Sequence, residues 1–484
     1  MPSLKFTNHF PAVTRIVTCG LAAVGCVVLA GCARFEAKPL SAATTTSSLE
    51  SRTLESPELK SFLQTNLHRD LTPWPQKAWD FQTLTLVAFY FHPSLDVARA
   101  QWGVAEAGVA TAGGRPNPVL SAVPGYSLNP ASGISPWFPS VSIDIPIETA
   151  GKRGYRIAQA QQLSDAAWLN IASVAWQVRS GVRTSLLDYA AAQQRAGLWH
   201  RQLQLQREIV TLLDQRFQAG AIGRNELTPA RLALAKSESE LADAIRQAAE
   251  SRLRLAESLG LPARAIEGIE LNSVLPTTSG SGMDLTSVEA RQRALLGRSD
   301  VLAALSEYAS RQSALQLEIA KQYPDVHLSP GYQFDQGEHK LSLGLSVELP
   351  VLNQNQGPIA EAKAKREESA ARFVALQAKV IAEVDRALAA RASAVEQAKR
   401  LEKLAQLALE QTASVEAQRK AGASDKLDLA SAQLEAAASE LALVDAQIKA
   451  AQVMAQLEDA MQLPLESWPA LEEGRGPQAK QEKP

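Results

Sequence analysis

Few side chains in this 484-residue chain have the types and spacing that chemistry requires. The six histidines are scattered, and none has the spacing of a metal-ligand set. All three cysteines lie in the leader region, up to Cys32, so the remaining chain has no disulfide framework and no cysteine zinc site. The stretch 150–153 has the Gly-Lys pair of a phosphate loop but lacks the upstream glycine and the Ser/Thr. The net charge of −2 argues against a nucleic-acid partner. The sequence therefore predicts no catalytic site, cofactor, metal site or nucleic-acid partner.

The one cysteine in a recognisable context is Cys32. Two basic residues precede an apolar run over 16–30, which is typical of a secretory signal over 1–31. The run ends Leu-Ala-Gly-Cys, which resembles the lipobox of bacterial lipoproteins and predicts an acylated Cys32 as the first mature residue. An ordinary signal peptide with a chance cysteine is the alternative. The Ser/Thr/Ala-rich residues that follow predict a flexible, lipid-anchored tether over 32–60.

Two carboxylates, Asp144 and Glu348, lie in stretches that alternate between apolar and polar residues. Residues 341–351 are apolar at every odd position, and residues 140–147 repeat the pattern. Such alternation predicts strands with one apolar and one polar face. Eleven residues match the roughly 9–11 that a strand needs to cross a bilayer. Both acids are then expected on the polar, water-facing side.

The body of the chain reads as two copies of one unit. Pro118–Tyr126 resembles Pro324–Tyr332, and each strand pair lies between helical segments. Strands are expected at about 118–147 and 324–351, each followed by a very long helix that stops at a glycine and returns. Heptad spacing of leucine predicts coiled-coil packing of these hairpins, which span 152–260 and 358–463.

Four strands leave two open edges, which lipid does not tolerate, and a closed transmembrane barrel needs about eight strands or more. The chain must therefore oligomerise if its strands span a membrane. Aromatic residues near the expected strand ends suit the membrane interface: Tyr126, Trp137, Phe138, Tyr332 and Phe334. A soluble β-element with core aromatics is the alternative.

The duplicated helix–strand–strand–helix unit, with its Pro-Gly-Tyr strands and glycine tips, resembles the TolC-type outer-membrane efflux channel family in its lipoprotein form. The resemblance implies an α+β membrane protein that forms a homotrimer. Its twelve-stranded barrel lies in outer-membrane lipid and continues into a long periplasmic coiled-coil barrel. Residues 146–153 and 350–357 are similar to the cobalt–zinc–cadmium efflux subgroup. The implied partners are a periplasmic adaptor and an inner-membrane RND-type pump, and the implied role is a passive exit duct for metal cations.

The resemblance also implies functions for the helical tips. Gly220, Gly223, Gly422 and Ser424 are expected to meet the adaptor. Asp428, six residues after Gly422, and Glu226, six after Gly220, are expected to narrow the pore and favour cations. A second family acid is replaced by Ser431, and either acid could simply complement a helix dipole.

The expected domains are a signal (1–31), a tether (32–60), an N-terminal equatorial segment (61–83), a first repeat (84–260), an equatorial connector (261–285), a second repeat (286–463) and a polar tail (464–484). A drug or protein-secretion duct remains an alternative within the same class. A periplasmic adaptor or scaffold is the alternative of another class, although adaptors carry one hairpin between β-rich modules and this chain has two.

Overall fold

The computed structural model describes residues 34–271 and 286–465. The signal peptide, Cys32, part of the connector and residues 466–484 of the polar tail lie outside the described residues. The chain divides into two compact units, Met1–Ser51 and Arg52–Pro484. In the first, helix α2 (Ala42–Glu50) buries no residue.

Part of the range expected to be a flexible tether, 32–60, is helical. Besides α2, the helix α3 (Pro57–Leu67) begins inside it. The Ser56 side chain caps α3 by accepting from the Leu59 N–H at 3.1 Å, and proline suits the first helical position. Leu59 and Leu63 are fully buried, so α3 is fixed by packing as well as by its cap.

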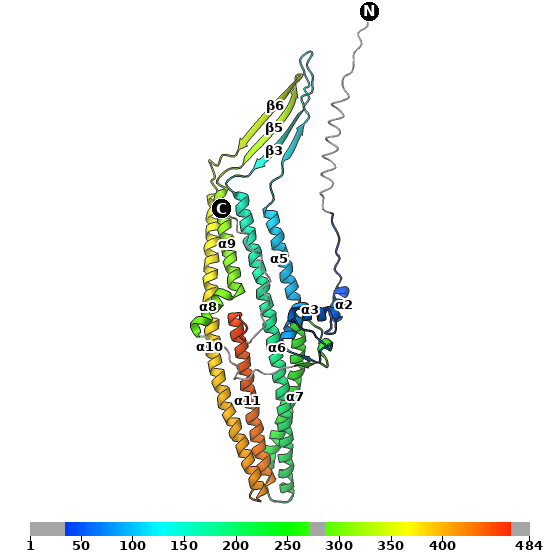
Figure 1. The fold of residues 1–484 in the computed structure, drawn as a ribbon, viewed down its shortest axis with the longest axis vertical. Helices are drawn as coiled ribbons and strands as arrows, with labels where there is room; N and C mark the ends of the chain where they lie inside the picture. The colour runs from blue at the N-terminus through cyan, green and yellow to red at the C-terminus, as the bar shows by residue number, and fades with distance from the viewer. Residues whose placement is uncertain (1–33, 272–285, 466–484) are drawn as a thin grey trace, which may run out of the picture. The chain divides into compact units, whose positions relative to one another are not determined.

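The second unit contains the expected duplication (Figure 1). The first copy comprises α4 (Phe81–Phe91), α5 (Pro93–Ala112), β2 (Val119–Val123), β3 (Ser140–Ile147), α6 (Lys152–Gln218) and α7 (Arg224–Leu259). The second comprises α8 (Ser287–Gly297), α9 (Ser299–Ala320), β5 (Val326–Asp335), β6 (Glu338–Val347), α10 (Gln356–Lys420) and α11 (Lys426–Met461). At about 1.5 Å per residue, α6 and α10 each extend roughly 100 Å.

The helix before each strand pair is broken at an equivalent place. His92 separates α4 from α5, and Arg298, 206 residues later, separates α8 from α9. Both have extended backbone; for His92 the cause is Pro93, which disfavours helical geometry in the residue before it. The end of the first return helix packs at this break: a Cβ on Gly260 would lie 2.8 Å from the Phe91 carbonyl oxygen, so glycine is required there.

A hydrophobic cluster lies around the middle of α6. Val178, Val182 and Leu186 of α6 pack with α3, α4, the end of α7 and the segment after it. Strand β1 (Ala78–Trp79) pairs in parallel with β4 (Glu270–Leu271), which joins the N-terminal segment to the described part of the connector. These two segments thus meet partway along the long helices.

The remaining strands form one antiparallel sheet in the order β2-β3-β5-β6. The sheet lies at one end of α5, α6, α9 and α10, and the hairpin turns of α6–α7 and α10–α11 lie at the opposite end of the long helices α6 and α10 (Figure 1). β5 and β6 have ten residues each and are joined by a two-residue turn, Gln336–Gly337, with positive φ at both positions.

Glu348 is not a strand residue, contrary to expectation. β6 ends at Val347, which pairs with Val326, the first residue of β5. Continuing the ladder would place Glu348 opposite Asp325 and Leu349 opposite Pro324, which has no N–H to donate to a neighbouring strand. The apolar–polar alternation therefore extends to residue 351, although the hydrogen-bonded strand β6 ends at Val347.

Candidate functional site: the two-faced sheet and the hairpin tips

The register of the sheet separates its side chains into two faces, because directly paired residues project to the same side. Leu120 pairs with Ile143, Leu328 with both Ile145 and Leu345, and Val326 with both Ile147 and Val347. One face therefore carries these apolar residues: Leu120, Ala122, Val141, Ile143, Ile145, Ile147, Val326, Leu328, Pro330, Tyr332, Leu341, Leu343, Leu345 and Val347.

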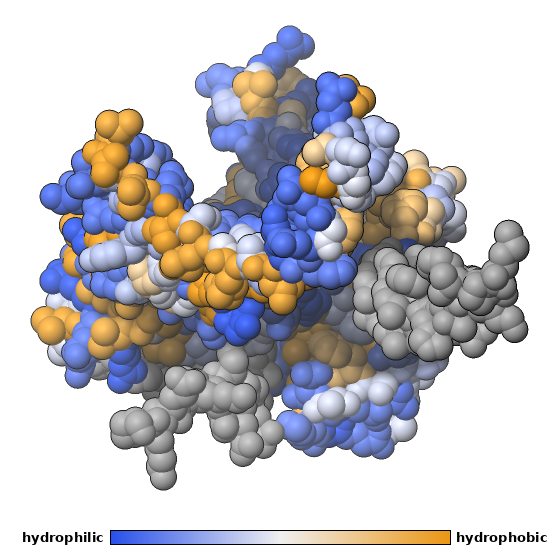
Figure 2. All heavy atoms as spheres, turned by 90° about the horizontal axis from the view of Figure 1, so that it is seen from above, coloured by the Kyte–Doolittle hydropathy of each residue, from blue (hydrophilic) through white to orange (hydrophobic). Residues whose placement is uncertain are grey.

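This apolar face has no cover within the chain. Leu341 is 86% exposed and Leu345 69% exposed. Seen from the end at which the strands lie, Figure 2 shows hydrophobic residues gathered in a band beside hydrophilic ones. Monomeric soluble proteins rarely expose a continuous apolar face of this kind, so it must contact lipid or another protein.

Aromatic side chains gather toward the far end of the sheet. The Tyr332 hydroxyl lies 2.7 Å from His339 Nδ1 on the apolar face, and the Phe334 ring lies against His339. Tyr126 and Trp137 form a bridge between the ends of β2 and β3, with ring centroids 4.9 Å apart. Each pair combines an apolar body with a polar tip, as interfacial aromatics do.

The opposite face carries mainly small polar residues, together with two valines of β2, the Lys340–Asp335 ion pair and a carboxylate–histidine contact. Asp144, expected on this face, lies there: its Oδ2 is 2.8 Å from His327 Nδ1, and its Oδ1 accepts from Ser329 Oγ at 2.9 Å. Sequence reasoning missed His327, although it falls in the polar phase of the same alternation. The two residues are 183 positions apart, and only the pairing of β3 with β5 brings them together.

A polar junction joins the sheet to the helices. Asp325, just before β5, accepts from the Thr149 N–H at 2.9 Å and from Lys152 Nζ at 2.8 Å. Burial alone would raise the pKa of Asp325, but these two donors outweigh it and hold the pKa below its usual range. Arg156 binds the Glu148 carboxylate and lowers its pKa in the same way. The junction thus fixes where α6 leaves the sheet.

The two hairpin tips have matching geometry. Gly220 and Gly422 adopt left-handed backbone, with φ of +70° and +79°. After them the Ala221 N–H donates to the Arg216 carbonyl at 2.8 Å and the Ala423 N–H to the Gln418 carbonyl at 2.9 Å. These 6→1 bonds are the Schellman ending that the glycines predicted.

Beyond the glycines the tips differ. Asp425 caps α11 by accepting from the N–H groups of Leu427 and Asp428, at 2.7 and 3.0 Å. Asp428 returns the contact: its Oδ2 accepts from the Asp425 N–H at 3.1 Å and from Ser424 Oγ at 3.0 Å. This reciprocal pair is a capping box. Asp428 therefore has a structural role whatever it does in a pore.

At the other tip, Gly223 occupies the N-cap of α7 without a side-chain bond, and Glu226 lies in the first turn with an exposed side chain. The equivalent of Asp425 is thus a glycine, so only one of the two tips has a side-chain cap. Glu226 is in the position where a carboxylate favours the helix dipole.

A series of ion pairs joins α6 to α11, which sequence reasoning missed because it depends on how the two hairpins pack. The arginines are on α6 and the acids on α11 or its cap: Arg179 and Arg183 with Glu458, Arg195 with Asp445, Arg201 with Glu440 and Arg216 with Asp425. The first set is buried: Glu458 is 0% exposed, and its other oxygen accepts from the Leu465 N–H at 2.9 Å. Arg179 also lies over the Phe81 and Trp176 rings.

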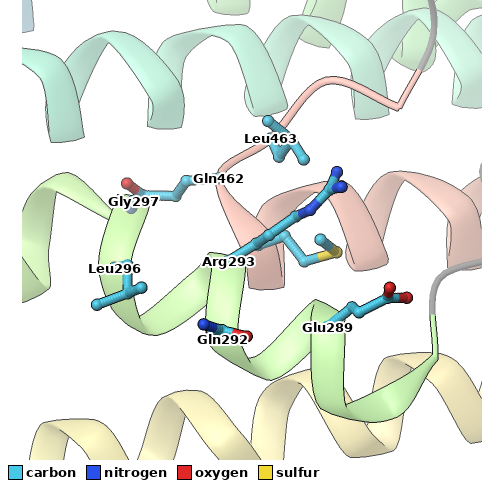
Figure 3. Close-up of a pocket in the computed structure, with 8 residues that line it drawn as sticks. Glu289, Gln292, Arg293, Leu296, Gly297, Gln462 and Leu463 are labelled. Atoms are coloured by element: carbon cyan, nitrogen blue, oxygen red, sulfur yellow. The ribbon is translucent and has the colours of Figure 1, made fainter.

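A separate hollow of about 600 Å³ lies between α8 and the end of α11. Figure 3 shows its lining residues, among them Glu289, Gln292, Arg293 and Leu296 of α8 and Gln462 and Leu463 after α11, with Arg293 extending toward the Leu463 side. Of the residues expected to be functional that the structure describes, none lines this hollow.

Over residues 34–271 and 286–465, no three or more His, Cys, Asp or Glu side chains are grouped to hold a metal ion. No helix in these same ranges is long and apolar enough to cross a membrane.

A curated relative, the cobalt-zinc-cadmium resistance protein CzcC of Cupriavidus metallidurans, is 27% identical over 272 residues. That alignment covers 56% of this chain and 62% of the relative, so the chain spans less than two thirds of the relative's length.

Solved structures share the fold. The outer-membrane channel OprN matches with a TM-score of 0.67 at 17% identity, covering 90% of this chain and 98% of OprN. The outer-membrane protein VceC of Vibrio cholerae matches with a TM-score of 0.64 at 20% identity, covering 80% and 97%. CusC, whose structures describe transmembrane channel formation, also matches with a TM-score of 0.64, at 17% identity, covering 81% and 95%.

The sequence profile described as "outer membrane efflux protein" matches residues 91–261 and 290–461. The two matched segments coincide with the two copies of the helix–strand–strand–helix unit, which confirms the family resemblance seen in the sequence. The chain belongs to the outer membrane efflux protein family.

Proposed function

We propose that three copies of this chain, each contributing four strands, close a barrel in the outer membrane and form the exit duct of a tripartite efflux system. The observation that carries the proposal is the sheet itself, which has an exposed apolar face and open edges on β2 and β6. In lipid an open edge leaves unpaired N–H and C=O groups, so β6 of one protomer must pair with β2 of the next. Strand pairing alone does not give the number of protomers; the number three is what the family resemblance implies.

In this assembly the apolar face contacts lipid and the face with Asp144 lines the pore. The ten-residue strands β5 and β6 match the length needed to cross a bilayer at a tilt. The long helices α6 and α10 continue as a coiled-coil barrel through the periplasm. The duct is passive, because energy comes from an inner-membrane RND-type pump acting through a periplasmic adaptor.

The hairpin tips are the proposed adaptor contact, through Gly220, Gly223, Gly422 and Ser424. Asp428 and Glu226 are the proposed constriction acids: both are exposed and both lie in the first turn of a returning helix. Three copies of a carboxylate around a narrow opening attract cations and repel anions. Cys32 is the proposed lipid anchor that remains after the signal peptide is removed.

The proposed cargo is a divalent metal cation. Its support is the curated relative, which is named for cobalt, zinc and cadmium resistance. Drugs or secreted protein would be the cargo if the cation proposal fails, since they would use the same kind of duct.

The test combines a growth assay with a pore measurement. Deleting the gene should make cells more sensitive to Zn²⁺, Co²⁺ or Cd²⁺, and the purified protein should form cation-preferring pores in planar bilayers as a cross-linkable trimer. Unchanged metal sensitivity with increased drug sensitivity would overturn the metal cargo. A purified protein that stays monomeric and forms no pores would overturn the duct.

A further inference from the structure

The polar face of the sheet holds a histidine oriented by a carboxylate. His327 Nδ1 lies 2.8 Å from Asp144 Oδ2, and Ser329 Oγ donates to the other oxygen of Asp144 at 2.9 Å. Both side chains are partly open to solvent, at 40% and 34% exposure. The pair is located where β3 ends and β5 begins, next to the junction with the helices.

The hydrogen bond fixes which ring nitrogen is available. A carboxylate only accepts hydrogen bonds, so Nδ1 must carry the proton in the contact with Asp144. In the neutral ring, the lone pair is then on Nε2. A histidine whose Nδ1–H is held by a carboxylate is the usual arrangement of a metal-binding imidazole, because the carboxylate fixes the tautomer and makes the nitrogen more basic.

The residues around the ring leave it accessible. His327 is paired with Pro146 on one side and Ser346 on the other, and the next position along β5, Ser329, is opposite Gly344. None of these side chains is long enough to cover an imidazole. The ring of His327 is thus flanked by small side chains, and the residue paired with Asp144 on β2 is the apolar Val119.

The local charge also favours a cation. Asp325, two residues before His327, binds Lys152 at 2.8 Å, so its charge is largely matched. Among residues 34–271 and 286–465, the side chains that bond to the Asp144 carboxylate are His327 and Ser329, and both are neutral when the ring is neutral. A cation near Nε2 would therefore be close to a carboxylate that no fixed positive charge neutralises.

We propose that His327 Nε2, oriented by Asp144, is a weak binding station for a divalent transition-metal cation such as Zn²⁺ on the pore side of the sheet. The inference rests on the proposed function, which makes this face the pore wall. One imidazole nitrogen with a supporting carboxylate is far from the four ligands of a structural zinc site, so water completes the coordination. Weak, open coordination is what conduction needs, because an ion that binds must also leave.

In the proposed trimer, each protomer contributes one such station at the same level of the barrel. Its position next to the helical junction places it where cargo passes from the helical part into the barrel. Mg²⁺, which prefers oxygen ligands and gives up water reluctantly, should bind there poorly.

The experiment is histidine footprinting of the purified full-length protein with diethyl pyrocarbonate, read by mass spectrometry. Zn²⁺ should slow modification of His327, whereas Mg²⁺ at the same concentration should not. Asp144→Asn should weaken the Zn²⁺ protection about tenfold, as the loss of an outer-shell partner does. His339 is the internal control: it is on the apolar face, bonded to Tyr332, and its modification should not respond to Zn²⁺.

Equal modification of His327 with and without Zn²⁺ would overturn the proposal, and so would full protection in Asp144→Asn. A pore measurement adds a second readout: Zn²⁺ should reduce the monovalent current of the wild type more than that of His327→Ala. The monovalent current of each protein with Mg²⁺ in place of Zn²⁺ is the control that the pores have assembled. Footprinting requires no conduction and no cellular cargo. If deleting the gene does not change metal sensitivity, the cargo proposal is rejected, but Zn²⁺ protection of His327 would still support the binding station. If the deletion raises metal sensitivity but Zn²⁺ does not protect His327, the binding station is rejected and the cargo proposal is kept.

Discussion

Arg216, near the end of α6, binds the carboxylate of Asp425, the N-cap of α11. The contact joins the tips of the two hairpins, which come from different copies of the duplicated unit. Asp425 thus serves two helices at once: it accepts from the first N–H groups of α11 and receives a guanidinium from α6. Any movement of the tips that separates α6 from α11 must break this contact.

The same carboxylate should make the tip sensitive to acid. The Asp428 backbone N–H, supported by Arg216, holds the pKa of Asp425 below its usual range. A lowered folded-state pKa stabilises the tip fully above the unfolded value of about 3.9, and the stabilisation is lost as the pH falls through the folded pKa. The protection factors for hydrogen exchange in the first turn of α11, taken relative to the intrinsic rate at each pH, should therefore fall in this acid range.

Substitutions at Asp425 separate its two roles. Asp425→Ala should destabilise the first turn by about 1 kcal/mol through loss of the cap, and accelerate its exchange at neutral pH. Asp425→Asn keeps a capping side chain but loses the charge, so its exchange should respond less to acid than that of the wild type. A wild-type acid response in Asp425→Asn would show that another group is responsible.

Asp428 can be tested for pore selectivity without destroying the cap. Asp428→Asn removes the charge but keeps an oxygen that can accept from the Asp425 N–H and Ser424 Oγ. If three Asp428 carboxylates line the opening, reversal potentials in planar bilayers should shift toward lower cation preference. Glu226→Gln is the matched variant at the other tip. Unchanged potentials in both would leave Asp428 as a helix cap only.

The buried Glu458 should matter more to stability than any exposed member of the same series. Glu458→Ala leaves Arg179 and Arg183 without their shared acceptor in a buried site, which costs about 3–5 kcal/mol. Glu440→Ala removes a partner of Arg201 where both side chains are about half exposed, which costs about 0.2–1 kcal/mol. Thermal unfolding of the two purified variants should separate clearly. Similar midpoints would mean that water or nearby groups compensate for the buried charge.

Cys32 lies outside the described residues, so its role is tested chemically. Cys32→Ser should abolish incorporation of labelled palmitate and weaken retention in the outer-membrane fraction, because the acyl chains supply the anchor. The other two cysteines, Cys19 and Cys26, are within the expected signal peptide and serve as controls: their serine variants should label normally. Continued labelling of Cys32→Ser would contradict the lipobox.

What the sequence predicted well is local in origin. The end of the first hairpin near residue 260 follows from Gly260, the C-cap of α7, and the apolar phase of β3 and β6 follows from period-two alternation. The contact of Asp144 with His327 could not be predicted, because strand register depends on the whole sheet. Glu348 was misplaced for a related reason: alternation shows which side a residue faces but not where the partner strand ends. The break at His92 could be predicted because Pro93 follows it, whereas the break at Arg298 is followed by Ser299 and has no such signal.

The face assignment of the sheet leads to the sharpest paired test. Leu343 is 72% exposed on the apolar face, and its neighbour Ser342 is on the polar face, paired with Gly331. Leu343→Arg would place a charge in lipid, at a cost of about 2–4 kcal/mol near the midplane, and should reduce the amount of assembled trimer in outer membranes. Ser342→Arg would place the same side chain in the water-filled pore. It should assemble nearly as the wild type does and change conductance instead, because Gly331 leaves space beside it. The two variants have the same new side chain at adjacent positions, so intrinsic strand propensity cannot explain a difference between them. If both assemble equally well, the apolar face does not contact lipid, and the soluble alternative for this sheet regains support.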